Sequence, residues 1–151
     1  MNFSDIKYLV VHCSATPPSD DIGFTEINKW HKERGWSGCG YHFIIRRDGT
    51  IERGRRLNEV GAHTYGYNRV SWGICMVGGV NTHNHADNNF RVPQFESLRI
   101  LINGLGVNAP KAKVLGHRDL SLDINGDGII EEWEWKKSCP CFDVRTWLTE
   151  R

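Results

Sequence analysis

An uninterrupted apolar run at residues 73–80, Gly-Ile-Cys-Met-Val-Gly-Gly-Val, is the feature that most constrains how this chain can fold. A run of this length and composition is typical of a buried strand. It predicts a β-sheet in which this segment takes a central position, because central strands are the ones shielded from solvent.

Shorter segments with strand and helix patterns lie on either side of that run. Strands are expected at residues 8–12, which end at a histidine, at 41–46, at 51–53 after the Asp48-Gly49-Thr50 turn, and at 114–115. Helices are expected from a Thr25 cap to Gly35, from Pro93 through Leu105, and over residues 143–148. The chain shows no internal repeat and no linker. The pattern therefore predicts a single α/β domain over residues 1–151, with a central mixed β-sheet flanked by helices.

Length and composition are those of an ordinary globular protein. The chain has 151 residues, enough to bury a core without disulfides, and it is 39% apolar and 25% charged. Nineteen basic and eighteen acidic residues leave a net charge of +1, which is too balanced for a general nucleic-acid binder. The five cysteines form no regular disulfide framework.

The N-terminus lacks the basic region and following apolar stretch of a secretory signal, and no segment approaches the roughly 20 apolar residues that span a bilayer. We therefore expect a protein that is synthesised in the reducing cytoplasm without a signal peptide and that has no membrane partner. If its substrate lies outside the cell, another agent must release it.

Three residues with metal-binding side chains stand where strands and loops meet. His12 ends the first expected strand, His117 follows the strand at 114–115, and Cys139 precedes Pro140. Their separations are too long for any local metal-binding motif. A single histidine at a strand end is more often structural, so spacing alone leaves both interpretations open.

Seven motifs in a fixed order link the chain to a known family. They are His-Cys-Ser-Ala-Thr at 12–16, Trp-His-Lys-Glu-Arg-Gly-Trp at 30–36, Gly-Tyr-His-Phe-Ile-Ile at 40–45, Arg-Asp-Gly-Thr at 47–50, Gly-Tyr-Asn at 66–68, Val-Gly-Gly at 77–79 and Cys-Pro-Cys-Phe-Asp at 139–143. Together they resemble the N-acetylmuramoyl-L-alanine amidases of the phage lysozyme type, which are related to animal peptidoglycan-recognition proteins.

The resemblance implies a zinc ion bound by His12, His117 and Cys139 at one end of the sheet. Three protein ligands leave a fourth tetrahedral position for water, which marks a catalytic zinc. The resemblance also matches Tyr41 to an active-site tyrosine and Lys137 to an active-site lysine. Either could stabilise the oxyanion or manage the proton that reaches the leaving amine, and the sequence does not divide these tasks.

The implied reaction is hydrolysis of the amide bond between N-acetylmuramic acid and L-alanine in bacterial peptidoglycan. The expected role is that of a phage or prophage endolysin, made in the cytoplasm and acting on the cell wall after release. A bacterial cell-wall recycling amidase and a non-catalytic peptidoglycan-binding module are the alternatives. We expect a monomer whose partner is peptidoglycan.

Three further residues have weaker assignments. His63 resembles a substrate-groove position, with a structural role equally open. His42 should point to the opposite side of its strand from Tyr41 and is expected to be structural. Cys141 lies two residues beyond Cys139 and is the one alternative thiolate.

Residues 123–134, Asp-Ile-Asn-Gly-Asp-Gly-Ile-Ile-Glu-Glu-Trp-Glu, match a twelve-residue EF-hand-type calcium loop that the phage lysozyme lacks. Calcium ligands are expected from Asp123, Asn125, Asp127, the Ile129 carbonyl and Glu134. Gly128 would supply the sharp turn, and an acidic surface loop is the alternative. The hypothesis is that calcium folds this insertion and thereby holds Lys137 and Cys139 in place.

Overall fold

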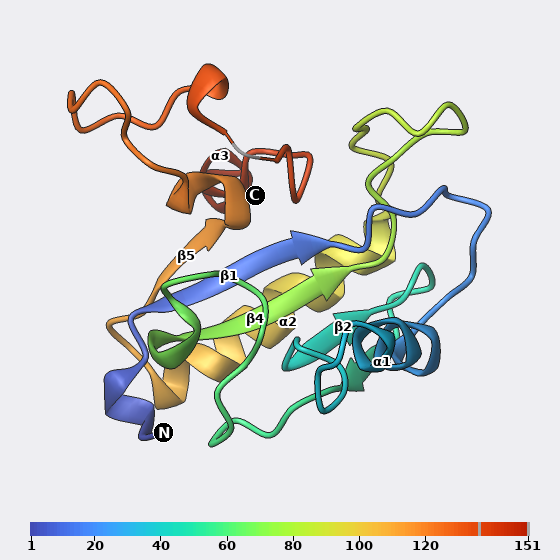
Figure 1. Cartoon of the computed structure of the whole chain (residues 1–151), viewed down its shortest axis with the longest axis horizontal. Helices are drawn as coiled ribbons and strands as arrows, with labels where there is room; N and C mark the ends of the chain where they lie inside the picture. Colours follow the sequence, from blue (N-terminus) through green and yellow to red (C-terminus); the bar gives the residue numbers. More distant parts are fainter. Residues whose placement is uncertain (136, 151) are drawn as a thin grey trace.

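The computed structural model of the chain describes residues 1–135 and 137–150. Its centre is a five-stranded mixed sheet in the order β3-β2-β4-β1-β5 (Figure 1). The strands are β1 (Tyr8–Cys13), β2 (Phe43–Ile45), β3 (Ile51–Arg53), β4 (Ser71–Met76) and β5 (Lys113–Gly116). β1, β2, β4 and β5 run parallel, and β3 pairs antiparallel with β2. The predicted α/β fold and the central position of the apolar run are confirmed.

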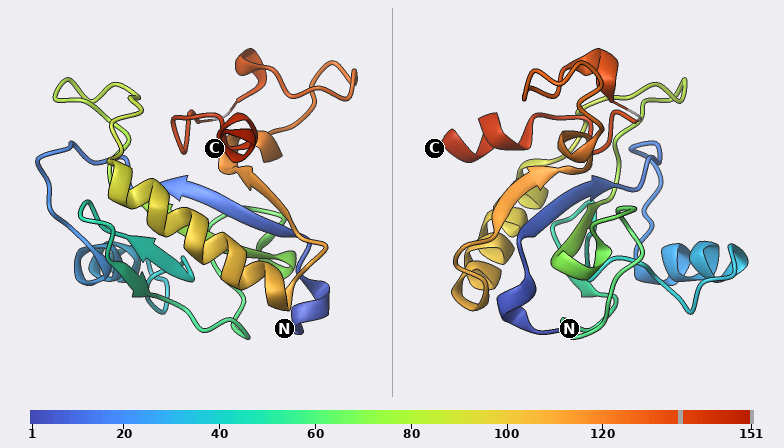
Figure 2. Two further views of the ribbon diagram at one scale, coloured as in Figure 1. Left: turned by 180° about the vertical axis from the view of Figure 1, so that it is seen from behind. Right: turned by 60° about the vertical axis from the view of Figure 1, so that its left-hand side comes forward.

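Helices cover both faces of the sheet, with α1 and α2 on opposite sides (Figure 2). The α-helices are α1 (Phe24–Glu33), α2 (Val92–Asn108) and α3 (Val144–Thr149), and the short 3-10 helices are η1 (Phe3–Asp5), η2 (Asn68–Val70), η3 (His117–Leu120) and η4 (Glu132–Glu134). None of the helices in the described ranges has the length and apolar character needed to cross a membrane.

Strand alternation divides the core between the two helical layers. On β4, Ile74 and Met76 pack in the large cluster with Leu98 and Ile102 of α2, whereas Cys75 packs in the smaller cluster with Ile27 of α1. The same alternation applies to β1, where the residue opposite Cys75 in register is His12. His12 therefore lies on the α1 side of the sheet.

Most element boundaries shift by a few residues from the prediction, and three of the differences have a clear local description. The strand expected over 41–46 is reduced to Phe43–Ile45. The central strand ends at Met76, because Gly78 and Gly79 adopt positive φ angles of 129° and 99° that regular strand does not allow. Thr25 is not a helix cap, since α1 already begins at Phe24 after Gly23.

Parallel pairing brings two strand ends to one edge of the sheet. β1 lies between β4 and β5, and all three run in the same direction. Groups at the carboxyl ends of such strands meet outside that edge, where ligands of α/β proteins usually bind. His12 near the end of β1 and His117 just after β5 are placed there by topology alone.

Candidate metal centre and active-site groove

The side chains of His12, His117 and Cys139 come together at the carboxyl edge of the sheet. One ligating atom from each lies within 4.8 Å of the others, and the two imidazole centroids are 4.6 Å apart. His12 is buried, and the other two side chains are half-buried. The structure thus unites three residues that are far apart in the sequence.

Backbone contacts hold the cysteine beside the histidines. The backbone N–H of Arg118, next to His117, donates to the carbonyl of Cys139 over 2.9 Å. The backbone N–H of Cys13, next to His12, donates to the Cys139 Sγ over 3.2 Å. Gly116 makes this approach possible, because a Cβ there would lie 2.7 Å from the Pro140 ring.

The donor set suits a zinc ion. Burial is the main cause of the lowered pKa of His12 and of His117, and the nearby Lys137 ammonium lowers both pKa values further. Both imidazoles are therefore neutral at pH 7, which is the form that binds a metal. Imidazole nitrogen and cysteine sulfur are both zinc ligands, and a set of three protein ligands leaves the fourth position open, as in catalytic zinc sites.

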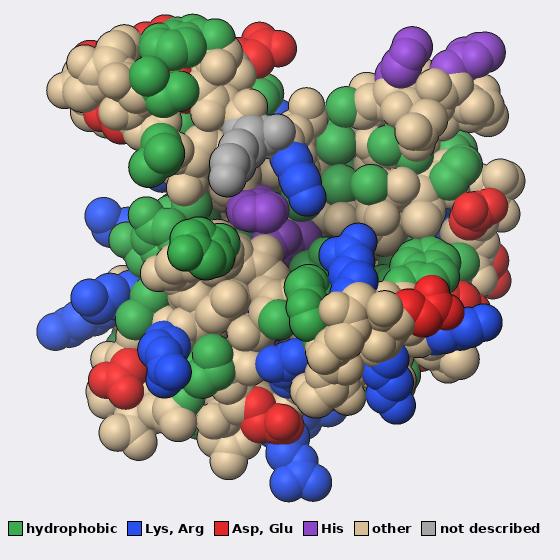
Figure 3. Space-filling model, in the orientation of Figure 1, with side chains coloured by type: hydrophobic (Ala, Val, Ile, Leu, Met, Phe, Trp, Pro, Cys, Tyr) green, Lys and Arg blue, Asp and Glu red, His purple; other side chains and the backbone are tan. Residues whose placement is uncertain are grey.

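These residues face a groove of about 510 Å³ between α1 and the sheet edge. Its lining also includes Trp30 and His31 of α1, Trp36, and the predicted residues Tyr41, His63 and Lys137. Histidine side chains lie at the bottom of a hollow near the centre of the face shown in Figure 3, with basic side chains beside them. All the predicted zinc-site and active-site residues thus share one groove.

Tyr41 presents a protonated phenol in this groove. Its ring lies 5.1 Å from that of His12. Burial, and then the neighbouring thiol groups, raise its pKa well above the ordinary value for tyrosine. The hydroxyl consequently keeps its proton at neutral pH and can donate a hydrogen bond. Lys137, by contrast, is exposed at the groove lining, where its ammonium stays accessible.

His63 lies directly against the metal-binding group. Its Nδ1 is 2.8 Å from the Nε2 of His12. Burial and the nearby His42, His117 and Arg55 lower the pKa of His63 to about 3, so the ring is neutral. His63 lines the groove as expected, and its assignment as a substrate contact stays a prediction.

The two remaining weak assignments are resolved by hydrogen bonding. His42 is fully buried, and its ring nitrogens contact the Glu59 carbonyl at 2.8 Å and the Gly73 backbone N–H at 3.1 Å, as expected for a structural residue. The Sγ of Cys141 lies 3.9 Å from that of Cys13. Among the described residues it does not belong to the group formed by His12, His117 and Cys139.

Sequence reasoning did not identify the aromatic wall of the groove. The helix expected from Thr25 to Gly35 carries Trp30 and His31, but no sequence pattern shows that these side chains border the histidines of the sheet. Arg34 lies 5.5 Å from the Trp36 ring and also lines the groove. A helical face that combines an exposed tryptophan with a buried histidine is the signal that could have suggested a binding surface.

A second group of possible metal ligands, made of carboxylates, lies within residues 123–134. Single oxygen atoms of Asp123, Asp127 and Glu134 lie within 4.8 Å of one another. Gly126 and Gly128 have φ angles of 72° and 83°, and their N–H groups donate to the Asp123 carboxylate over 3.1 and 2.7 Å. Asp123, Asp127 and Glu134 occupy positions one, five and twelve of the predicted calcium loop.

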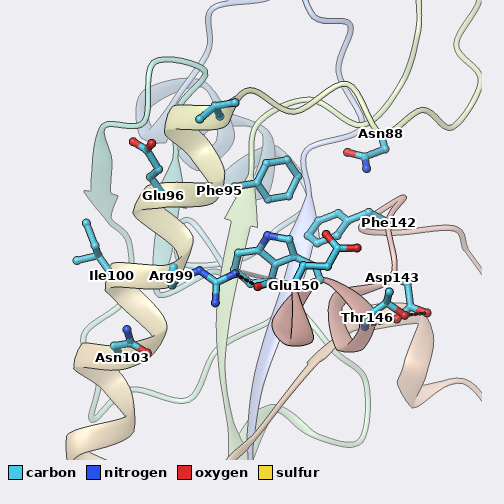
Figure 4. Close-up of a pocket in the computed structure, with 12 residues that line it drawn as sticks. Asn88, Phe95, Glu96, Arg99, Ile100, Asn103, Phe142, Asp143, Thr146 and Glu150 are labelled. Carbon is cyan, nitrogen blue, oxygen red and sulfur yellow. Dashed lines mark hydrogen bonds between the residues drawn. The ribbon is translucent and has the colours of Figure 1, made fainter.

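A larger pocket of about 790 Å³ lies between α2 and α3, as Figure 4 shows. Its aromatic lining includes Phe95, Phe142 and Trp147. The guanidinium of Arg99 lies 4.5 Å from the Trp147 ring, and Phe95 lies 5.8 Å from it between ring centroids. The tryptophan is thus already packed, and neither metal-binding group of the described residues lies in this pocket.

The fold and the groove define an α/β protein with a His-His-Cys group that could hold a metal ion in an aromatic cleft. The profile of the N-acetylmuramoyl-L-alanine amidase family matches residues 2–141. This chain belongs to that family.

Curated relatives agree with that assignment. The chain is 42% identical over 138 residues to an endolysin of Enterobacteria phage K11, a match that covers 91% of this chain and 82% of that protein. It is also 42% identical to the endolysin of Escherichia phage T7, over 92% of this chain and 83% of the relative. Among solved structures, the N-acetylmuramoyl-L-alanine amidase LysC from Clostridium intestinale superposes with a TM-score of 0.74 at 28% identity. That superposition covers 99% of this chain and 89% of LysC.

Proposed function

We propose that this protein hydrolyses the amide bond between N-acetylmuramic acid and L-alanine in bacterial peptidoglycan, as a phage-type endolysin that binds zinc through His12, His117 and Cys139. One observation carries the proposal. The three metal-binding side chains, Tyr41 and Lys137 all line one groove in a member of the amidase family. The endolysin role is supported by the 42% identity to phage endolysins over most of both chains.

Zinc bound by these three side chains would supply Lewis acidity to the amide carbonyl and lower the pKa of a bound water. The residues of the chain bind the substrate and stabilise the charge that develops on it. The groove holds the glycopeptide so that its lactyl amide lies beside the metal-binding group. The aromatic side chains of Trp30 and Trp36 offer apolar surfaces against which the substrate can pack.

Tyr41 and Lys137 are the proposed charge-stabilising residues. The Tyr41 hydroxyl keeps its proton, so it can donate to the oxygen that becomes negatively charged when water adds to the carbonyl carbon. The Lys137 ammonium can donate to the same oxygen. When the carbon–nitrogen bond breaks, the departing L-alanine nitrogen takes up a proton, which either group can supply.

We further propose that the insertion binds calcium through Asp123, Asn125, Asp127, the Ile129 carbonyl and Glu134. The grouped carboxylates and the match to the loop pattern support this. Glu134 closes the loop from a buried position, where its carboxylate accepts from the N–H groups of Ile124 and Glu131. The proposed effect of calcium is structural, and the proposed active species is a monomer.

Mass spectrometry of digested peptidoglycan tests the proposed reaction. Wild-type protein should release stem peptides that begin with L-alanine and leave intact glycan strands, and Cys139→Ala should release none. New reducing sugar ends would contradict the proposal, because they indicate glycan cleavage. Binding of peptidoglycan without any released product would instead support a non-catalytic recognition module.

A further inference from the structure

We propose that His63 is a positioning residue for the metal ligand His12: it accepts the hydrogen of His12 Nε2 and so presents Nδ1 of that imidazole to the metal. This inference rests on the proposed zinc site and adds the residue that orients one of its ligands. It differs from a substrate-contact role for His63, because it requires an effect on metal affinity in the absence of substrate.

A chain of hydrogen bonds sets the direction of each proton. The hydroxyl of Ser71 donates to the Tyr67 carbonyl over 2.8 Å, so its oxygen is left as an acceptor for Nε2–H of His63, 3.3 Å away. Protonation of His63 at Nε2 leaves a lone pair on its Nδ1. That lone pair lies 2.8 Å from His12 Nε2, which must therefore carry the hydrogen.

Thr64 completes the surroundings of the same nitrogen. Its Oγ1 lies 3.3 Å from His12 Nε2 and 3.0 Å from His63 Nδ1. His12 Nε2 thus faces the Nδ1 lone pair of His63 and the hydroxyl oxygen of Thr64 on the protein side. With Nε2 occupied in this way, the lone pair on Nδ1 is the one that remains for a metal.

The structure around His63 is built to hold the ring in this position. A Cβ at Gly73 of β4 would lie 2.6 Å from the His63 ring, and one at Gly61 would lie 2.7 Å from it, so both glycines make room for the imidazole. The side-chain carbonyl of Asn68 accepts from the backbone N–H groups of His63 and Thr64, each over 2.9 Å. The His63 ring therefore lies against the sheet, and hydrogen bonds to Asn68 hold the His63 backbone in place.

The consequence is an orienting contact of the kind that ligating histidines usually need. Loss of such a partner typically weakens metal binding by about 10–100-fold, because the imidazole is then free to rotate and to change tautomer. An acceptor oxygen at the position of Nδ1 should preserve most of the effect. Asparagine offers one, since its Oδ1 takes nearly the same place as a histidine Nδ1.

The test is the zinc dissociation constant, measured by competition with a chelating indicator on metal-free protein without substrate. His63→Ala should bind zinc about 10–100-fold more weakly than wild type, and His63→Asn should recover most of the affinity. Tyr65→Ala is the matched control, because Tyr65 lies in the same loop and is 98% exposed. It should bind zinc as wild type does.

The outcomes separate this inference from the proposed function. Wild-type zinc affinity in His63→Ala, together with weaker binding to peptidoglycan, would overturn it and make His63 a substrate contact. A wild-type protein that binds no zinc would overturn the proposed metal site itself. A nitrogen-15 spectrum of zinc-loaded wild type tests the tautomer directly and needs no variant. A hydrogen on His12 Nε2 supports the inference, and ligation through Nε2 overturns it.

Discussion

The guanidinium of Arg118 lies 3.9 Å from the centroid of the Trp135 ring, while the backbone N–H of the same arginine donates to the Cys139 carbonyl. Trp135 directly follows residues 123–134, and Arg118 directly follows His117. Arg118 therefore joins Trp135 to two proposed metal ligands, His117 and Cys139. This contact is a physical route by which order in residues 123–134 can reach the proposed zinc site.

The strength of that contact can be measured with a double-mutant cycle. Arg118→Ala and Trp135→Ala should show a coupling free energy of about 0.5–2 kcal/mol in urea unfolding, the range for a cation over an indole ring. Trp133→Ala, whose ring is 57% exposed, is the control and should show no coupling to Arg118→Ala. Additive effects of Arg118→Ala and Trp135→Ala would mean that the stacking does not stabilise the fold.

Calcium should stabilise the protein at constant zinc. At a calcium concentration of about 100 times its dissociation constant, the gain in unfolding free energy is about 2.7 kcal/mol, which a thermal melt detects. Glu134→Gln should remove most of this gain, whereas Glu132→Gln should retain it, since Glu132 is exposed and outside the carboxylate group. A melting temperature and a lytic activity that calcium does not change in the wild type would contradict the proposed function of the loop.

The two neighbouring thiols should differ sharply. Cys139→Ser should lose bound zinc and lytic activity, because its sulfur lies with His12 and His117. Cys141→Ser should keep both, since its sulfur contacts Cys13 instead. Metal analysis of the purified, dialysed variants checks this. Zinc retained by Cys139→Ser and lost by Cys141→Ser would show that the thiolate ligand had been misassigned.

Removing the hydroxyl of Tyr41 should slow the reaction without disturbing the fold. Tyr41→Phe keeps the ring that packs beside His12 and removes only the hydroxyl. Loss of one oxyanion donor typically lowers kcat by about 100–1,000-fold, with a small change in KM. Tyr8→Phe serves as the control, because Tyr8 does not line the groove. A Tyr41→Phe enzyme with wild-type kcat would leave Lys137 as the stabilising residue.

Acid should destabilise the protein through His31. Its Nδ1 accepts from the Gly40 N–H over 2.8 Å, and burial, with Arg34 and Arg55 nearby, lowers its pKa from 6.5 to about 4. Between these values the unfolded chain binds more protons than the folded one. The stability that neutral His31 contributes is therefore full above pH 6.5 and is lost as the pH falls towards 4.

Urea unfolding of the zinc-free protein at pH 7.5 and pH 5 measures this effect. His31→Asn keeps an acceptor for Gly40 but does not titrate in this range, so its stability should fall less between the two pH values. The other histidines with lowered pKa values act equally in both proteins. An identical loss of stability in His31→Asn would show that His31 does not contribute.

Local patterns were sufficient to predict the main elements of the fold. The apolar run beginning at Gly73 lies in the central strand, and the helix expected from Pro93 through Leu105 is present as α2. The resemblance predicted that His12, His117 and Cys139 share one site, and the three side chains lie together in the structure. These successes depend on periodicity and on ordered motifs, which the chain carries in its linear sequence.

Contacts made by loops could not be predicted in the same way. His63 and Trp135 lie outside regular elements, so no periodicity sets the direction of their side chains. The contact of His63 with His12 requires the space that Gly61 and Gly73 leave for an imidazole against the sheet. Gly73 belongs to β4 and not to the loop that carries His63, so a local sequence pattern does not predict this space.

The hydrogen bond from the Cys13 N–H to the Cys139 Sγ spans 126 positions of the chain. When the ribosome has synthesised the residues of β1 and α2, it has not yet added Cys139. The complete set of three proposed metal ligands exists only after the segment around Cys139 has been synthesised and has returned to β1. A nascent chain that lacks this segment would thus lack the proposed metal site, and we expect no wall-degrading activity from it.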